Sequence, residues 1–404
     1  AAQGVIHMSN ILVCSKCLLP ETVESLVIGD DGVCSVCKNI SYKHTSINWE
    51  ERGHRFDEIL DAHRGQGQYD CVVPFSGGKD STYTLWYLVK VKKLKPLVVR
   101  FDHGFFRPTL QDNALKTFRR LGVDVHNFTP NFQVVRKLMY ESLRRKGDFC
   151  WHCHTGIFAY PMWVSIRYET PLVIWGESGA EYSSWYSFEE QEEMDQRRFD
   201  LKINRGIAAE DMIGMLDNSI SGYPVTSRDL IPFSYPPRRD LKKAGTKSVF
   251  LGRYIPWDVK YNYATIQKEL DWKGEQVEGV PPQYDYEKIE CFMQGVRDYI
   301  KFLKRGYART AHLASIDIRN GRLTREEGQK LVDQYDGKRP YALDLFLDYL
   351  GITEEHFHDL VKMHEVRPHT TPSCGECQRC QVVPWDAEMW PKIGSIQRTT
   401  PEIL

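Results

Sequence analysis

A glycine-rich turn between an apolar run and a helix-like segment constrains this chain most. Asp70-Cys71-Val72-Val73-Pro74 precedes Phe75-Ser76-Gly77-Gly78-Lys79-Asp80-Ser81, and a mostly apolar segment over 82–89 follows. Two adjacent glycines let the backbone approach an anion closely, and free N–H groups at a helix N-terminus favour negative charge. The spacing of these glycines and the lysine differs from that of the Walker A phosphate-binding loop, G-x-x-x-x-G-K-[ST]. The sequence therefore predicts a different kind of phosphate-binding loop, to which Ser76, Ser81 and Lys79 add side-chain donors.

Two further apolar runs end in polar turns. Residues 96–105 read as a buried strand that reaches Asp102, and residues 171–175 run into Gly176-Glu177. Ligands of open α/β sheets lie beyond the carboxyl ends of the strands, so we expect these turns and the loop to meet at one site. The alternative for Asp102 and Glu177 is ordinary turn chemistry.

Candidate helices alternate with these strands between residues 51 and 185, which is the pattern of a parallel sheet covered on both faces. Apolar spacing predicts helices over 49–63, 81–91, 110–121, 132–146, 291–304, 324–335 and 342–350. We expect an α/β fold with its nucleotide domain over 51–185. The other expected units are a four-cysteine knuckle over 8–50, a substrate-pocket insertion over 186–285, a helical region over 286–365 and a cysteine-containing tail over 366–404.

Nine of the 11 cysteines lie in C-x-x-C pairs or their extension. Random placement would give roughly 0.3 such pairs. The N-terminal pairs, Cys14/Cys17 and Cys34/Cys37, have the spacing of a closed tetrahedral zinc site with four thiolates. A redox dithiol is the alternative. A disulfide framework is not expected, because the sequence shows no export signal.

The remaining cysteines form a second group. Cys150 and Cys153 lie between the second and third candidate strands, while Cys374, Cys377 and Cys380 lie in the Pro-rich tail. We expect Cys150 and Cys153 to share a zinc ion with two tail thiolates. The alternatives are zinc bound by the tail with His369, or an iron–sulfur cluster with three cysteine ligands. Cys71 and Cys291 stand alone in apolar settings and are expected in the core.

The loop Ser76-Gly77-Gly78-Lys79-Asp80-Ser81 resembles the signature of the PP-loop ATP pyrophosphatases, which have the adenine nucleotide alpha hydrolase-like fold. These enzymes split ATP to AMP and pyrophosphate while adenylating a carbonyl oxygen. The resemblance implies that ATP contacts all six loop residues, together with Asp102, Gly176 and Glu177. Lys79 and Asp80 are then the catalytic candidates: Lys79 stabilises charge on the pyrophosphate, and Asp80 helps to hold Mg²⁺.

A longer series of motifs narrows the resemblance. The knuckle, the loop, the motif at 101–105, the Cys150 pair, the turn at 176–178, the helical motifs at 304–310, 318–321 and 323–328, and the terminal cysteines occur in one order. Together they resemble the N-acetyl sugar amidotransferases of bacterial surface polysaccharide and LPS O-antigen synthesis. That resemblance implies adenylation of an acetamido oxygen on a nucleotide-linked sugar. Ammonia then displaces AMP and gives an acetamidino sugar. It also implies a separate glutaminase partner pair resembling the histidine-biosynthesis amidotransferase subunits.

Three arginines are candidates for the anionic part of such a substrate, because guanidinium groups bind phosphate bidentately: Arg305, Arg309 and Arg319. For each of them a solvated helix face is the alternative. A PP-loop tRNA thiolase is the competing enzyme class, and a non-catalytic zinc module is a third hypothesis. The formal charge of −1 speaks against a nucleic-acid substrate. No apolar run approaches the ~20 residues of a membrane helix, and we expect a cytoplasmic protein.

Overall fold

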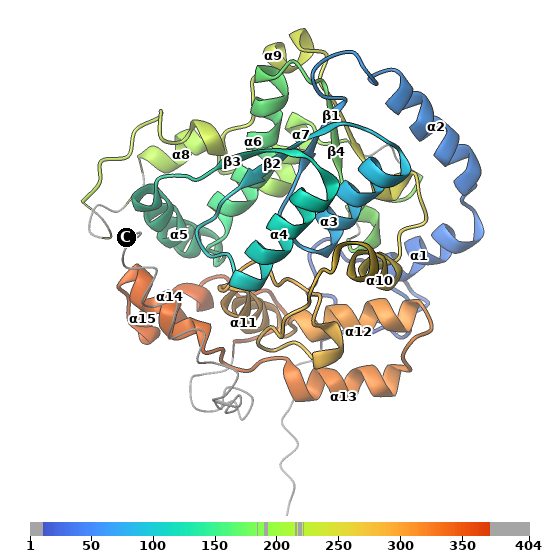
Figure 1. The fold of residues 1–404 in the computed structure, drawn as a ribbon. Helices are drawn as coiled ribbons and strands as arrows, with labels where there is room; N and C mark the ends of the chain where they lie inside the picture. The colour runs from blue at the N-terminus through green and yellow to red at the C-terminus, as the bar shows by residue number, and fades with distance from the viewer. Residues whose placement is uncertain are drawn as a thin grey trace, which may run out of the picture.

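A five-stranded parallel sheet forms the centre of the protein in a computed structural model (Figure 1). The structure describes residues 11–371, apart from 184, 190–192, 215, 217–219 and 221. The strand order is β3-β2-β1-β4-β5, and the strands are β1 (Cys71–Pro74), β2 (Pro96–Phe101), β3 (Asp124–Phe128), β4 (Leu172–Trp175) and β5 (Lys247–Phe250). The order reverses between β1 and β4, which is where open α/β sheets bind ligands. The predicted α/β class with a parallel sheet is confirmed.

Both faces of the sheet are covered, which explains the continuous apolar runs in β1, β2 and β4. Alternate residues of β1 enter different cores: Val72 packs with α5 (Phe132–Lys146) and α6 (Trp151–Arg167), and Val73 packs on the opposite face. That opposite face is covered by α3 (Lys79–Trp86), α4 (Pro108–Leu121) and α10 (Val259–Leu270). A π-helical turn, η1 (Tyr87–Val91), extends α3.

The remaining helices lie at the two ends of the chain and in the 186–260 region. They are α1 (Ser35–Thr45), α2 (Trp49–Asp61), α7 (Gln196–Arg198), α8 (Ala209–Ile213), α9 (Arg238–Lys243), α11 (Gln294–Arg305), α12 (Arg309–Arg319), α13 (Arg325–Tyr335), α14 (Ala342–Leu350) and α15 (Glu354–Lys362). Short π or 3-10 turns occur at η2 (Gly179–Glu181), η3 (Phe199–Ile203), η4 (Ile231–Phe233), η5 (Leu251–Arg253) and η6 (Pro282–Tyr284). None of the helices in the described part of the chain is long and apolar enough to cross a membrane.

Local sequence signals set several of these boundaries. The side chain of Asn131 accepts a hydrogen bond from the Gln133 N–H and begins α5, and Gly147 ends that helix in the left-handed conformation. The Thr324 and Glu327 side chains form a capping box at the start of α13. The predicted bounds of α5 and α14 agree with the structure, and those of α2, α4, α11 and α13 differ by a few residues at most.

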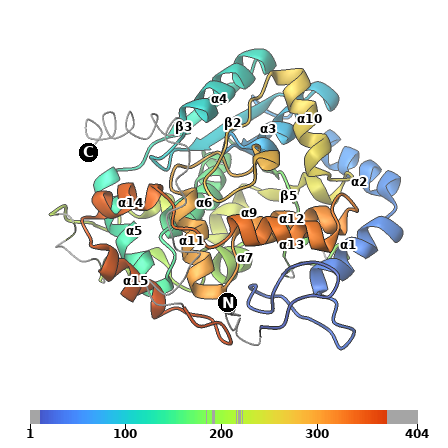
Figure 2. The ribbon, with the colours of Figure 1, turned by 90° about the horizontal axis from the view of Figure 1, so that it is seen from below.

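The C-terminal helices bring distant parts of the chain together. Seen from below, α11, α12 and α13 lie across the molecule, and the N-terminal cysteine loops lie beside α12 and α13 (Figure 2). The Leu18 N–H donates to Ser315 Oγ at 3.1 Å, which joins the cysteine loops to α12. The Phe292 N–H donates to the Phe105 carbonyl at 2.9 Å, which joins the start of α11 to the turn after β2.

Candidate active site

The predicted phosphate loop lies between the end of β1 and the start of α3. Its own serines hold its shape: Ser81 Oγ accepts the Gly77 N–H at 3.2 Å, and Ser76 Oγ accepts the Gly78 N–H at 3.3 Å. Gly77 has a φ of 90°, which favours glycine. The loop therefore presents hydroxyl groups and a helix N-terminus at the carboxyl edge of the sheet.

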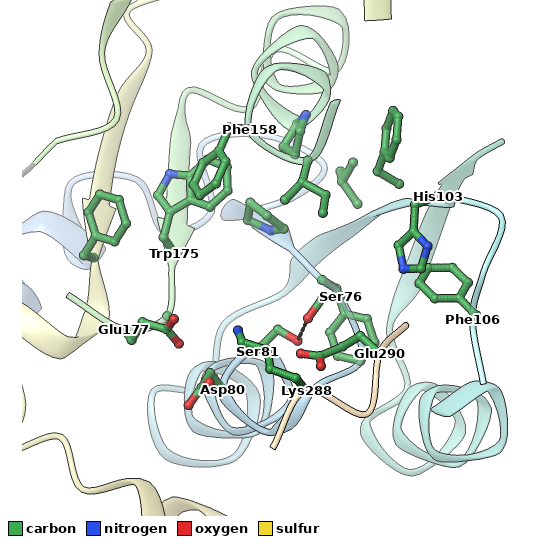
Figure 3. A pocket seen from close by; sticks show the side chains of 18 residues that line it. Ser76, Asp80, Ser81, His103, Phe106, Phe158, Trp175, Glu177, Lys288 and Glu290 are labelled. Atoms are coloured by element: carbon green, nitrogen blue, oxygen red, sulfur yellow. Dashed lines mark hydrogen bonds between the residues drawn. The ribbon is translucent and has the colours of Figure 1, made fainter. Parts of the chain in front are cut away.

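A cavity of about 190 Å³ opens beside this loop (Figure 3). Ser76, Asp80 and Ser81 line it on the loop side. Phe158 of α6 and Trp175 of β4 line the opposite side and stack with ring centroids 4.9 Å apart and an interplanar angle of 29°. The cavity thus offers anion-binding groups at one end and flat aromatic surfaces at the other, which suits a phosphate joined to a planar base.

A second cavity of about 160 Å³ adjoins the first. The two cavities share Asp80, Glu177 and Lys288. Arg309 and His312 of α12 line the second cavity, so its far wall comes from the C-terminal part of the chain. A group bound there would lie next to the same carboxylates as a nucleotide bound in the first cavity.

Buried ion pairs connect the loop to the C-terminal region. Lys79 Nζ lies 2.8 Å from Asp80 Oδ2 and 2.9 Å from Glu287 Oε2, and Glu287 also pairs with Arg309 at 3.4 Å. Burial opposes the charge of Lys79, but the carboxylates of Asp80 and Glu287 outweigh burial and hold its pKa well above the ordinary value. Lys79 is therefore a permanent cation at the start of α3.

Burial shifts the pKa values of two other groups at the cavities. Burial, followed by the charge of Asp80, raises the pKa of Glu177 well above its ordinary value. Burial and the charges of Lys301 and Arg309 lower the pKa of His312 well below its ordinary value, so the imidazole is unprotonated at neutral pH. Both residues line the second cavity.

Glu290 is a site residue that the sequence motifs did not indicate. It lies just before α11 and lines the first cavity, and its carboxylate is so close to the loop that a Cβ on Gly78 would lie 1.9 Å from Oε1. Oε2 of Glu290 and Oδ1 of Asp80 are buried carboxylate oxygens without a hydrogen-bond partner among the described residues. No motif marks Glu287, Lys288 or Glu290. The available signal was a cluster of four charged residues, Asp285, Glu287, Lys288 and Glu290, next to an apolar run.

Of the other residues predicted to bind ATP, some line the first cavity and one does not. Gly176 lines the first cavity together with Glu177. Asp102 does not line it: its carboxylate accepts the Gly104 N–H at 2.8 Å and the Thr129 hydroxyl at 3.3 Å, which is the turn chemistry named as the alternative.

The three candidate arginines lie in three different environments. Arg309 lines the second cavity and pairs with Glu287 and Asp298. Arg305 lies elsewhere, bonded to the Thr22 carbonyl and, at 3.4 Å, to Glu24. Arg319 lines neither cavity. Of the three, Arg309 alone is placed where it would reach a ligand of this site.

The four N-terminal cysteines form a compact, buried group, as their spacing predicts. Cys14 Sγ lies 3.9 Å from Cys37 Sγ, and Cys17 Sγ lies 3.8 Å from Cys34 Sγ. Zn–S bonds of about 2.3 Å in a tetrahedron place sulfurs about 3.8 Å apart, so the group fits zinc. Hydrogen bonds with the Cys34 and Cys37 thiols, and then the charge of Arg319, lower the pKa of Cys17.

The second cysteine group is described only in part, because Cys374, Cys377 and Cys380 lie outside the described residues. Cys150 and Cys153 lie at the start of α6. Burial raises the pKa of the Cys153 thiol, and the neighbouring Cys291 raises it further. Cys291, expected in the core, is partly buried and is a neighbour of this pair. Cys71, the other expected core cysteine, is fully buried. Within the described residues, only the N-terminal group brings three or more potential ligand atoms within 4.8 Å of one another.

Comparisons with known proteins bear on the C-terminal half of the site. A family model described as LPS biosynthesis protein WbpG-like, C-terminal domain, matches residues 282–371. This segment contains α11 to α15 and supplies Glu287, Lys288, Glu290 and Arg309. The C-terminal region is therefore similar to a domain of LPS biosynthesis proteins.

A curated relative is the uncharacterized protein MJ1599 of Methanocaldococcus jannaschii, which is 30% identical over 107 residues. The match covers 26% of this chain and 38% of the relative, so the chain spans well under half of that protein.

Two solved structures are similar at low identity. They are the U34-tRNA thiolase NcsA from Methanococcus maripaludis with its [4Fe-4S] cluster (14% identity, 80% of this chain, 88% of that chain, TM-score 0.30) and NMN synthetase from Francisella tularensis (12%, 59%, 100%, 0.27). Both TM-scores are below 0.5, and we draw no conclusion about function from them.

Proposed function

We propose that this protein is an ATP-dependent N-acetyl sugar amidotransferase. It adenylates the amide oxygen of an N-acetyl group on a nucleotide-linked sugar, and ammonia then displaces AMP to give an acetamidino sugar for LPS or another surface polysaccharide. The WbpG-like match over residues 282–371 supports the link to LPS biosynthesis.

The pair of cavities that meet at Asp80, Glu177 and Lys288 is the observation that carries this proposal. The first cavity suits ATP, with its phosphates at the loop and its base against the aromatic side chains. The second suits the acceptor group, because it opens onto the same shared residues. An adenylation reaction requires this adjacency, since the attacking oxygen must lie in line with the phosphorus that it attacks.

The proposed chemistry needs positioned charge and no protein nucleophile. The amide oxygen attacks the α-phosphorus of ATP while the bond to pyrophosphate breaks. Ammonia then adds to the former amide carbon, a proton leaves, and the bond to AMP breaks. Lys79 and the loop N–H groups stabilise the charge that develops on pyrophosphate. His312, with its unprotonated imidazole at the second cavity, is the group placed to accept the proton from the added ammonia.

Two metal ions belong to the proposal. Asp80 and Glu290 would hold Mg²⁺, because each has a buried carboxylate oxygen that accepts no hydrogen bond from the described residues, and Mg²⁺ would neutralise the pyrophosphate charge. Cys14, Cys17, Cys34 and Cys37 would hold a structural Zn²⁺ with no open coordination position. We further propose that a glutaminase partner pair supplies the ammonia in cells, in a cytoplasmic reaction.

Mass spectrometry of a candidate N-acetylated nucleotide sugar tests the reaction. After incubation with ATP, Mg²⁺ and ammonium, we expect an amidine that is lighter than the acetamide because NH replaces O, and equal amounts of AMP and pyrophosphate. Free ammonium should support the reaction without a partner. An unchanged sugar across a panel of substrates, together with thiolation of tRNA, would instead establish the competing thiolase class.

Loop variants test the nucleotide site separately. Ser76→Ala and Ser81→Ala remove hydroxyls that line the first cavity, and each should lower the rate of pyrophosphate release while the fold persists. Ser142→Ala is the matched control, because Ser142 is a buried serine of α5 that donates to the carbonyl of Met139 in its own helix and lines neither cavity. A control that loses as much activity as the loop variants would argue against the assignment.

A further inference from the structure

The residues that line both cavities differ in charge. Asp80 and Glu177 carry carboxyl groups, whereas Lys288 carries a cation and lies with Asp80 on the loop side of the first cavity (Figure 3). In the proposed reaction an acceptor in the second cavity attacks the α-phosphorus of ATP in the first, so the α-phosphate must lie where the cavities meet. Phosphate oxygens attract a cation and repel a carboxylate. Lys288 is therefore the shared residue whose charge suits the α-phosphate.

Lys288 also differs from the other Lys and Arg side chains of the described lining in its partners. Lys79 Nζ lies 2.8 Å from Asp80 and 2.9 Å from Glu287. Arg309 lies 3.4 Å from Glu287 and also pairs with Asp298. Lys288 forms no ion pair and no side-chain hydrogen bond with any residue in the described part of the chain. Its amine is the cation of this site that a ligand can engage without breaking an ion pair.

The backbone of Lys288 has a conformation that lysine rarely adopts. Its φ is 53°, in the left-handed region. The other described non-glycine residues with a positive φ line neither cavity: Ser25, Lys93, Glu169, Arg205 and Asp271. Such conformations persist where the surrounding structure enforces them, and they concentrate at functional sites. The strain at Lys288 thus points to a requirement for its side chain at this place.

The neighbours of Lys288 fix the segment that carries it. On one side, Glu287 pairs with Lys79 of the phosphate loop. On the other, the Glu290 carboxylate lies so close to Gly78 of the loop that a Cβ there would meet it at 1.9 Å. The segment is therefore anchored to the loop both before and after Lys288, which holds the lysine at the junction of the cavities.

We propose that Lys288 is a catalytic residue that binds the α-phosphate of ATP and stabilises the charge that develops there during adenylation. The acceptor oxygen forms a bond to the α-phosphorus as the bond to pyrophosphate breaks, and pyrophosphate leaves with the bonding electrons. Lys288 stays protonated and donates hydrogen bonds to the α-phosphate oxygens, while Lys79 and the loop bind the departing phosphates. This assignment rests on the proposed function, and binding of AMP tests it apart from the reaction.

Calorimetric titration with AMP and with adenosine is the direct test, because the two ligands differ by the α-phosphate alone. Lys288→Gln removes the cation and should weaken AMP binding about 10- to 100-fold, as loss of a hydrogen bond to a charged group does. Its affinities for adenosine and for pyrophosphate should equal those of wild type. The rate of AMP formation from ATP should fall about 100- to 1,000-fold.

Glycine variants separate the charge of Lys288 from its backbone. Lys288→Gly should keep close to wild-type thermal stability, since relief of strain offsets the freedom that glycine adds to the unfolded chain. It should nevertheless lose AMP affinity as Lys288→Gln does. Lys93→Gly is the matched control, because Lys93 has a φ of 57°, is exposed and lines neither cavity. Its AMP affinity should not change.

Several results would overturn the proposal. One is equal AMP affinity in wild type and Lys288→Gln. Another is an equal loss of adenosine affinity, which indicates a structural role, and a third is a loss of pyrophosphate affinity alone, which places Lys288 at the leaving group. Wild type that binds no AMP would remove both this assignment and the nucleotide site. If wild type binds AMP through Lys288 but amidates no acetamido sugar, the α-phosphate contact is supported and the proposed substrate is wrong.

Discussion

Lys79 Nζ of the phosphate loop lies 2.9 Å from Glu287 Oε2, and both side chains are at least nine-tenths buried. The two residues are 208 positions apart in the sequence. The pair joins the parallel sheet to the segment that matches the WbpG-like C-terminal domain, so the loop and the C-terminal wall of the cavities are electrostatically coupled.

The first prediction concerns this pair. Glu287→Gln should lower the free energy of unfolding by about 3 kcal/mol, because removing one partner leaves buried charges less well compensated. The measurement is urea denaturation. Asp31→Asn breaks the pair between Lys38 and Asp31, whose side chains are both more than half exposed, and should change stability little. Equal effects of the two substitutions would contradict a buried ion pair at Lys79.

The second prediction concerns the backbone of the loop. Gly78→Ala should leave the protein folded, since the added methyl meets the flexible end of Glu290, but it should weaken ATP binding roughly tenfold or more by blocking close approach of the phosphates. Isothermal calorimetry measures this. Gly53→Ala is the matched control: nothing lies within 4 Å of its added methyl, and an alanine inside α2 should raise stability by about 0.5–1 kcal/mol. Unchanged ATP affinity in Gly78→Ala would remove the loop from the nucleotide site.

The third prediction concerns the pH dependence of stability. Glu278 is 4% exposed, and burial raises its pKa from 4.5 to about 7. Its pKa in the folded state lies above the unfolded value, so the unfolded state releases the proton first as pH rises. This carboxyl therefore makes stability fall between about pH 4.5 and pH 7. Glu278→Gln should remove that fall, and the variant should gain about 2–3 kcal/mol on wild type between about pH 5 and pH 8. If the free energy of unfolding of wild type and of Glu278→Gln had the same pH dependence, this prediction would be wrong.

The fourth prediction concerns the second cysteine group. The double variant Cys150→Ser, Cys153→Ser should lose one metal equivalent by elemental analysis and retain the metal of Cys14, Cys17, Cys34 and Cys37. Cys71→Ser is the control, as a buried cysteine of β1 outside both groups. Metal content that is equal in all three proteins would rule out a metal at Cys150. Stoichiometric iron and sulfide in wild type would favour the thiolase alternative.

Sequence reasoning identified the centre of the sheet and missed its edges, for a physical reason. β1, β2 and β4 are buried on both faces and read as apolar runs. β3 is an edge strand, Asp124–Phe128, whose side chains are all exposed or half-buried, so it has no such run. β5 has four residues and lies in a stretch without clean periodicity. α6 was also missed, because its mostly apolar sequence shows no helical periodicity of apolar and polar residues.

The candidate site also combines residues that a local motif indicates with residues that only the tertiary structure brings there. The loop could be found because its glycines and hydroxyls are local requirements of one short turn. Glu287, Lys288 and Glu290 could not, because they reach the site through tertiary contacts more than 200 residues from the loop.

The C-terminal wall of the two cavities is encoded late in the sequence, which has a consequence for synthesis of the protein. Lys288, Glu290 and Arg309 follow the last strand of the sheet, so a nascent chain can complete the sheet and the phosphate loop before these residues leave the ribosome. Such a chain holds the loop but lacks the C-terminal wall of both cavities. Under the proposed function, truncated translation products would carry an open half-site, and ATP turnover would begin only with a chain made through α12.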